Sequence, residues 1–251
     1  MDFNIKAKTM IGLAVLAMIL SQGALAHGEP LIEDALECIL EPNTEIEISA
    51  SVSGVLSHVL VQRGDRVKRG QVLARLVSGL ERATVELAKA QVEFGKRKAI
   101  RNEDLYNKEL ISIHEKDEMD TEILIASLQL KQAQEQLKLR SITSPINGVV
   151  VERDKDPGEY VENEPLLTVV SLNPLNVEVV VPAEQIGAIK KGMRGKVSTV
   201  APVSKTYNAR VILIDQVIDA ASGTIRVRLA LPNPKNKIPA GLNCYVKFMS
   251  K

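Results

Sequence analysis

The chain has 251 residues, and its 32 lysines and arginines nearly balance its 31 aspartates and glutamates, for a formal net charge of +1. A protein that binds nucleic acid through its phosphates needs a clustered excess of basic side chains, so this balance argues against a nucleic-acid partner. Aromatic residues make up only 3% of the chain. Its cores must therefore be packed from valine, isoleucine, leucine and alanine.

Residues 1–26 have the pattern of a secretory signal peptide. Two lysines precede an apolar run over residues 11–20, and the small residues of an Ala-Leu-Ala sequence follow. We predict cleavage between Ala26 and His27. The alternative, an uncleaved membrane anchor, needs about 20 apolar residues, roughly twice the length of this run. The mature product is then an exported protein.

Residues 27–48 have strand character, and we expect this segment to join the C-terminal sheet. It contains Cys38, and the only other cysteine is Cys244. An exported protein with an even number of cysteines can form a disulfide, and two buried free thiols are the alternative that the sequence leaves open. On neighbouring strands, bonded cysteines have Cα atoms about 4.4 to 6.8 Å apart.

A small β unit occurs twice. The segment VSGVLSHVLVQRGDRVKRGQVL, residues 52–73, returns without a gap as INGVVVERDKDPGEYVENEPLL, residues 146–167, so that matched positions lie 94 apart. The halves occupy residues 49–78 and 142–171, and each contains a turn at a glycine followed by an acidic residue. Neither half is large enough to bury its apolar face alone. We therefore predict that the two form one flattened β-sandwich.

Residues 79–141, between the halves, predict an antiparallel α-helical hairpin. Helix formers replace the β-branched runs here, and proline is absent until position 145. Apolar residues of the second arm follow the 3-4-3-4 spacing of a coiled-coil seam, and we assign the first-arm seam to residues recurring every seven positions. The second-arm seam is Ile123, Ala126, Leu130, Ala133 and Leu137, and the first-arm seam is Leu80, Ala83, Leu87, Ala90 and Phe94. Ser112 and Glu115 form the capping-box pattern of the returning helix.

Residues 172–251 predict a β-barrel. Short alternating segments are separated here by turn signals at glycine, asparagine and proline. The acidic residues Glu178, Asp215 and Asp219 fall on these strands, where we interpret them as polar-face residues. Motifs for nucleophilic, metal-dependent or phosphate-binding catalysis do not occur in the sequence. The fold class is thus mainly β: a sandwich split by an antiparallel coiled-coil hairpin and followed by a barrel.

The order of these parts resembles the periplasmic adaptor proteins, or membrane fusion proteins, of tripartite efflux pumps. The phrases that carry the likeness are RSITSPINGVVVERDKDPGEYV, LNPLNVEVVVP and SGTIRVRLALPNPKNKIPAGL, together with the first half-motif. The resemblance implies lipoyl-like half-motifs and a non-catalytic adaptor without a cofactor. It implies a location in the periplasm of a Gram-negative bacterium, associated with the cell envelope.

The resemblance also implies partners and a docking site. The partners are an inner-membrane transporter, a TolC-type outer-membrane channel and further copies of the chain in a ring; a resistance-nodulation-division transporter is favoured and an ATP-driven one stays open. Family members often carry an arginine, a leucine and a serine at the hairpin tip, where they meet the channel. Arg101, Leu105 and Ser112 stand at those spacings. Many members also have a membrane-proximal domain beyond the barrel, which we expect to be absent or reduced here.

Two other functions are alternatives to the adaptor. Lipoyl and biotinyl carriers use the same half-motifs, but they need a lysine at the tight turn between the halves, where this chain has about 60 helical residues. A periplasmic metal-handling protein needs clustered soft ligands. The three histidines and the methionines of the mature chain are instead scattered, so we predict no metal site.

Overall fold

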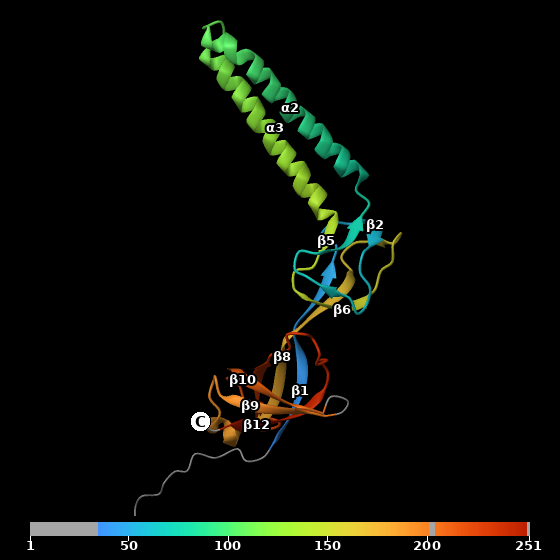
Figure 1. Ribbon diagram of the computed structural model, residues 1–251, viewed down its shortest axis with the longest axis vertical. Coiled ribbons are helices and arrows are strands. Elements are labelled where there is room, and N and C mark those ends of the chain that lie inside the picture. Colours follow the sequence, from blue (N-terminus) through green and yellow to red (C-terminus); the bar gives the residue numbers. More distant parts are fainter. Residues whose placement is uncertain (1–34, 201–203, 250–251) are drawn as a thin grey trace, which may run out of the picture.

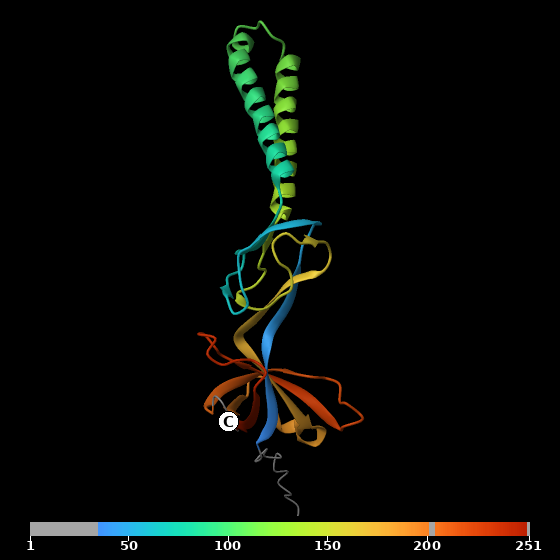
Figure 2. The same cartoon turned by 90° about the vertical axis from the view of Figure 1, so that its right-hand side faces the viewer.

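The computed structural model describes residues 35–200 and 204–249. Three parts follow one another along the long axis of the molecule: a helical hairpin, a small β-sandwich and a β-barrel (Figures 1 and 2). The predicted signal peptide, with its cleavage position between Ala26 and His27, lies outside the described residues. The mainly β fold with a long helical hairpin is confirmed.

The two halves of the sandwich repeat each other strand for strand. Strands β2 (Gly54–Val59) and β3 (Arg66–Val67) of the first half recur 94 positions later as β6 (Gly148–Arg153) and β7 (Tyr160–Val161). The turn glycines that match, Gly64 and Gly158, have φ angles of 95° and 96°, a left-handed conformation that other residues rarely adopt. The repeat in the sequence is therefore a repeat in the backbone.

The halves exchange their short strands. β3 of the first half pairs with β6 of the second, and β7 of the second pairs with β2 of the first. The pair Val67↔Gly148 and the pair Gly54↔Val161 are equivalent under the offset of 94. The shared core lies between these strands and holds fully buried side chains from both halves, including Leu56, Leu73, Val150, Val161 and Leu166.

The barrel contains β9 (Arg194–Thr199), β10 (Thr206–Ile214), β11 (Thr224–Leu231) and β12 (Asn243–Met249). Two longer strands complete it, β1 (Leu36–Ser49) and β8 (Pro165–Pro182). The order β1-β12-β9-β10-β11-β8 is closed by pairing of β8 with β1. Alternate residues face inward, so the core is a valine- and leucine-rich cluster that includes Val177, Val179, Val181, Val197, Val227, Leu229 and Val246.

Strands rather than a flexible linker join the barrel to the sandwich. β1 and β8 pair from Cys38↔Val179 in the barrel to Ser49↔Pro165 in the sandwich, with a register shift between Pro42 and Thr44. Both strands can be followed between the two domains in Figures 1 and 2. The expected division at residues 171 and 172 falls inside β8. A break there would cost hydrogen bonds in both domains.

The hairpin consists of α2 (Gly79–Asn107) and α3 (Ile113–Leu139), which pack along their length (Figure 1). It leaves the sandwich after β4 (Val72–Leu76) and returns at β5 (Ser141–Thr143), two strands that pair directly. At 1.5 Å per residue the arms are about 43 and 40 Å long. The predicted seam of α3 does face α2, because all five of its residues are buried or half-buried.

The seam predicted for α2 is wrong. Leu80, Leu87 and Phe94 are 78%, 63% and 59% exposed, and Ala83 and Ala90 are exposed as well. The residues that pack on α3 have the same 3-4 spacing but are mostly small: Val85, Ala88, Val92, Gly95, Ala99 and Asn102. A Cβ atom on Gly95 would lie 3.0 Å from Cγ1 of Ile123, so the helices approach too closely for bulky side chains between them.

We predict that the sandwich folds without the hairpin. Replacement of residues 80–139 by a short turn should leave cooperative thermal unfolding intact, because β4 and β5 already pair at Arg75↔Ser141. Circular dichroism of the deletion variant measures this. Leu73→Asp in the same variant, which places a charge in the sandwich core, should abolish the transition. If the deletion variant without Leu73→Asp also unfolded non-cooperatively, the hairpin would have to be counted as part of the core.

Candidate docking site at the hairpin tip

The tip of the hairpin is a tight connection between two rigid helices. α2 ends at Asn107. The amide of Lys108 donates to the carbonyl oxygen of Asp104 at 3.2 Å, and the amide of Glu109 donates to that of Tyr106 at 2.9 Å. Glu109 follows with a φ of 56°, an uncommon left-handed conformation for a residue with a side chain. The chain then reverses over five residues to the start of α3 at Ile113. The backbone here is determined by the two helix ends, so the tip presents its side chains in a fixed arrangement.

Ser112 caps the returning helix, as its sequence pattern predicts. The amide of Glu115 donates to Oγ of Ser112 at 3.2 Å, and the amide of Ser112 donates to Oε2 of Glu115 at 2.7 Å. These hydrogen bonds to the Glu115 carboxylate, first from the Ser112 amide and then from its hydroxyl, lower the pKa of Glu115. Because the pKa of Glu115 is lowered, the cap contributes fully to the stability of α3 at pH values above the ordinary glutamate pKa. That contribution is lost as the pH falls through the lowered pKa.

Arg101 and Leu105 lie on α2 just before the turn. They are four residues apart and therefore share one face of the helix, the same face that carries Leu80, Leu87 and Phe94. Arg101 is exposed and has no hydrogen-bond or ion-pair partner among residues 35–200 and 204–249. Leu105 is also exposed. The three predicted docking residues thus come from one helix end and the cap of the next helix.

Two further tip residues escaped the sequence analysis. Leu110 and Ile113 flank the cap and are 67% and 66% exposed, so bulky apolar side chains point to solvent on both sides of Ser112. The sequence could have indicated them, because they are two large apolar residues beside the serine of a predicted turn, and a turn at the end of a hairpin has no core to bury them. Neither side chain packs into the hairpin, so both join the candidate contact residues of the tip.

The inside of the tip combines the buried side chain of Met119 with polar contacts. Nδ2 of Asn102 lies 3.2 Å from Sδ of Met119, and the ammonium of Lys116 lies 4.9 Å from the ring centroid of Tyr106. The cation–π contact joins the end of α2 to the first turn of α3. These contacts keep the arms together without using the exposed leucines and isoleucine.

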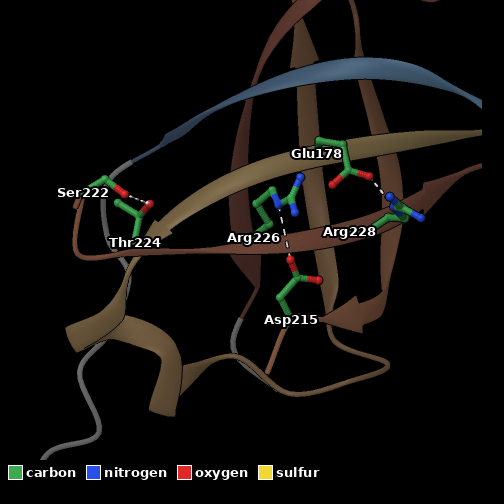
Figure 3. Close-up of polar contacts among 6 residues, drawn as sticks. All are labelled: Glu178, Asp215, Ser222, Thr224, Arg226 and Arg228. Carbon is green, nitrogen blue, oxygen red and sulfur yellow. Dashed lines mark hydrogen bonds and ion pairs between the residues drawn. The ribbon is translucent and has the colours of Figure 1, made fainter. Parts of the chain in front are cut away.

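The carboxylates of the barrel are paired with arginines, not with each other. Figure 3 shows Glu178 of β8 beside Arg228 of β11, and Asp215 beside Arg226 of β11. The Arg226 Nε to Asp215 Oδ2 distance is 3.3 Å. Asp219 instead accepts from the amides of a loop, with Ala221 at 2.8 Å. Glu178 is therefore a strand residue as predicted, whereas Asp215 and Asp219 lie in the connection between β10 and β11 and not on a strand.

Cys38 and Cys244 are directly opposite each other on β1 and β12. Their Cα atoms are 4.8 Å apart, and the structure joins them in a disulfide that links positions 206 residues apart. Both side chains belong to the barrel core. The bond would fasten the N-terminal strand of the barrel to its last strand.

No helix within residues 35–200 and 204–249 is long and apolar enough to cross a membrane. In the same part of the chain, groups of three or more His, Cys, Asp or Glu side chains placed to hold a metal ion are also absent.

The fold defines a class: a barrel-sandwich hybrid split by a helical hairpin and followed by a separate β-barrel. Family models match both β parts, a CzcB-like barrel-sandwich hybrid domain over residues 44–171 and a CusB-like β-barrel domain over residues 175–251. The chain belongs to the family of periplasmic adaptor proteins, or membrane fusion proteins, of efflux pumps. Members of this family are adaptors without catalytic activity.

Relatives are similar over most of this chain. The antibiotic efflux pump periplasmic linker ArpA of Pseudomonas putida is 23% identical over 218 residues, which cover 80% of this chain and 59% of ArpA. The multidrug resistance protein MdtA of Klebsiella pneumoniae is 26% identical over 243 residues, or 88% of this chain and 59% of MdtA. The chain therefore spans less than two thirds of the length of these relatives.

Solved structures share the fold. A MacA–MexA chimeric protein that contains the Pseudomonas aeruginosa MexA α-hairpin domain superposes with a TM-score of 0.72 at 19% identity, covering 86% of this chain and 80% of the chimera. The membrane fusion protein Spr0693 of Streptococcus pneumoniae gives 0.68 at 19% identity, covering 87% and 99%. At these identities the likeness is one of architecture.

We predict that the two cysteines are bonded in the exported protein. Thiol titration of denatured, non-reduced protein should find no free thiol, and reduction should lower the free energy of unfolding by up to about 5 kcal/mol in the loop-entropy model. Denaturant unfolding with and without reductant measures the change. Cys38→Ser with Cys244→Ser, as a control, should be insensitive to reductant. Two titratable thiols in the untreated protein would contradict the prediction.

Proposed function

We propose that this chain bridges an inner-membrane transporter and a TolC-type outer-membrane channel in the periplasm of a Gram-negative bacterium. The observation that carries the proposal is the hairpin: two arms of about 40 Å that extend away from the β domains and end in exposed apolar side chains. A structure of this length with no role in the core is built to reach a partner. Relatives named as periplasmic linkers of efflux pumps support the same function.

The two ends of the molecule would then meet different partners. The tip would contact the channel, and the β domains at the other end would contact the transporter (Figure 1). We infer a resistance-nodulation-division transporter, because the CusB-like family model that matches the barrel is named as a β-barrel of resistance-nodulation-division systems. An ATP-driven transporter is the alternative, and co-purification with a candidate of each type distinguishes them.

The tip is suited to docking because it combines two kinds of contact. Leu105, Leu110 and Ile113 offer exposed apolar area, and Arg101 has a guanidinium that no group of the described chain engages. Its planar fork can donate to carboxylates or carbonyls of a partner, which an ammonium does less specifically. Each such contact contributes about 1 to 3 kcal/mol, and several adaptors on one channel would multiply the effect.

We predict that Arg101→Asp and Leu105→Asp abolish efflux and crosslinking to the channel while export, thermal stability and transporter binding stay nearly unchanged. Both positions are exposed, so the substitutions remove contact without disturbing the helix. Lys89→Asp, an exposed position on α2 far from the tip, is the matched charge-reversal control and should pump normally. Normal efflux by the tip variants at equal protein levels would refute the docking assignment.

The exposed apolar residues along the hairpin support assembly into a ring. On α2, Leu80, Leu87 and Phe94 form a stripe, and on α3, Leu124, Ile125 and Leu128 form a patch. The stripe and the patch differ, so packing one against the other in a neighbouring copy gives a head-to-tail contact, the type that closes into rings. Such a contact would shield apolar surface that the single chain leaves in water.

We predict that Leu87→Asp together with Phe94→Asp lowers self-association, because each places a charge within the stripe. Sedimentation velocity of the purified chain over a range of concentrations measures the effect. Lys89→Asp, an exposed position on another face of α2, is the control and should associate like the parent. Equal association of the stripe variant and the parent would show that copies do not meet through α2.

The carrier alternative finds no support in the sandwich. Between β4 and β5, where a carrier presents its modifiable lysine on a tight turn, the chain leaves into α2 and returns from α3. Mass spectrometry of the exported protein would reveal a lipoyl or biotinyl adduct directly. The metal-handling alternative is tested by titration calorimetry with divalent ions.

A further inference from the structure

A groove of about 460 Å³ lies at the root of the hairpin, where α2 and α3 leave the sandwich. Its lining comes from β4, from the first turns of α2, from the last turns of α3 and from β5. Four cationic side chains line it, Arg75, Arg82, Lys138 and Arg140, and the lining contains no acidic residue. The groove is far along the hairpin from the docking tip (Figure 1). It thus forms a second site with its own charge.

Two of the four cations are already engaged. Arg140 forms an ion pair with Glu81 at 2.7 Å and donates from Nη1 to the carbonyl oxygen of Ser53 at 2.9 Å. Nζ of Lys138 lies 3.3 Å from Oε2 of Glu135, but both side chains are well exposed, and ion pairs of this kind contribute little to stability. Arg140 therefore has a structural role, and Lys138 remains available to a stronger partner.

Arg75 and Arg82 have no such partner. Within residues 35–200 and 204–249 neither guanidinium takes part in a hydrogen bond or an ion pair. They approach the groove from different parts of the molecule, Arg75 from β4 of the sandwich and Arg82 from the first turn of α2. Like charges that converge on one groove repel each other unless an anion lies between them.

The N-terminus of α2 adds to the positive field. Ser78 is its N-cap residue, yet the serine side chain accepts no capping hydrogen bond. Ser78 is only 8% exposed, lines the groove and has no partner for its hydroxyl among the described residues. The first-turn amides without a side-chain cap and the helix dipole favour an anion at this end. The carboxylate of Glu81, in the same turn, offsets part of this field but is itself paired with Arg140. The Ser78 hydroxyl is also available to donate to an anion in the groove.

We propose that this groove binds a phosphate group, either inorganic phosphate or a phosphate monoester. Two guanidinium forks, an ammonium, a serine hydroxyl and helix N-terminal amides offer more donors than a carboxylate can accept, whereas a phosphate dianion presents three terminal oxygens. The volume of the groove is in the range of small-ligand sites. The phosphate can be free in solution or carried by a lipid, and the chemistry of recognition is the same.

A bound phosphate would couple the hairpin to the sandwich. Arg75 belongs to β4, Arg82 to α2 and Lys138 to α3, so one anion would bridge a strand of the sandwich and both arms of the hairpin. The site is separate from the channel-docking residues, and it stands whether or not the tip docks to a channel. A bound phosphate would therefore make the base of the hairpin stiffer than it is in the ligand-free protein.

Titration calorimetry of the full chain with inorganic phosphate at low ionic strength tests the site. We expect Arg75→Gln with Arg82→Gln to weaken binding at least about tenfold, or roughly 1.4 kcal/mol. Lys96→Gln with Arg97→Gln removes the same charge from an exposed part of α2 and should bind like the parent. Binding by the parent should also weaken as the pH falls through the second pKa of inorganic phosphate, where the dianion gains a proton. Absence of phosphate binding by the parent, or equal weakening in both double variants, overturns the proposal.

A second arm identifies the source of the phosphate and does not depend on the double variant. Vesicles of phosphatidylcholine with and without phosphatidic acid, a monoester lipid, are sedimented with the parent protein and with the single variant Arg82→Gln. Binding to phosphatidic acid that inorganic phosphate displaces supports a lipid-borne ligand, and binding of inorganic phosphate alone supports a soluble one. Vesicle binding that Arg82→Gln leaves unchanged and that phosphate does not displace overturns the lipid source.

Discussion

The reciprocal pairing between the two half-motifs is the interaction on which the rest of the molecule depends. Each half is a few short strands that cannot bury their apolar faces alone, and each is completed by one strand of the other, β3 on β6 and β7 on β2. The same arrangement brings β4 beside β5 and so gives the hairpin a single root. The hairpin, its tip and its basic groove are all positioned by this exchange of strands.

The long strands β1 and β8 continue from the sandwich into the barrel. β1 and β8 pair across both domains, with register shifts between Pro42 and Thr44 and between Ile48 and Ser49. The barrel is therefore attached to the sandwich through a hydrogen-bonded ladder instead of a loose linker. The barrel then closes through β12, and the cysteine pair lies at that junction. A force applied to the barrel would therefore be transmitted to the sandwich and to the base of the hairpin.

Much of this architecture is visible in the sequence, and the failures have physical causes. The constant offset of 94 predicted that the two half-motifs have the same strands and turns, because the turn glycines and the apolar positions recur together. The α2 seam was misassigned since leucine and phenylalanine are the most apolar residues there, whereas close helix packing selects Ala88, Gly95 and similar small residues. The basic groove had no signal, because folding alone unites Arg75 and Arg82 with residues some 60 positions later. The Arg101, Leu105 and Ser112 positions came from family resemblance, and the structure adds Leu110 and Ile113 beside them.

The small-residue seam of the hairpin limits how its length can evolve. Insertion of seven residues in each arm lengthens the hairpin by about 10.5 Å and keeps the packing face in phase, because seven residues make nearly two full turns. Insertion of two or three residues would instead rotate everything beyond it by a large angle and would turn the tip away from its partner. Adaptation to a wider or narrower cell envelope is then restricted to whole heptads, so the reach of the protein changes in steps rather than continuously.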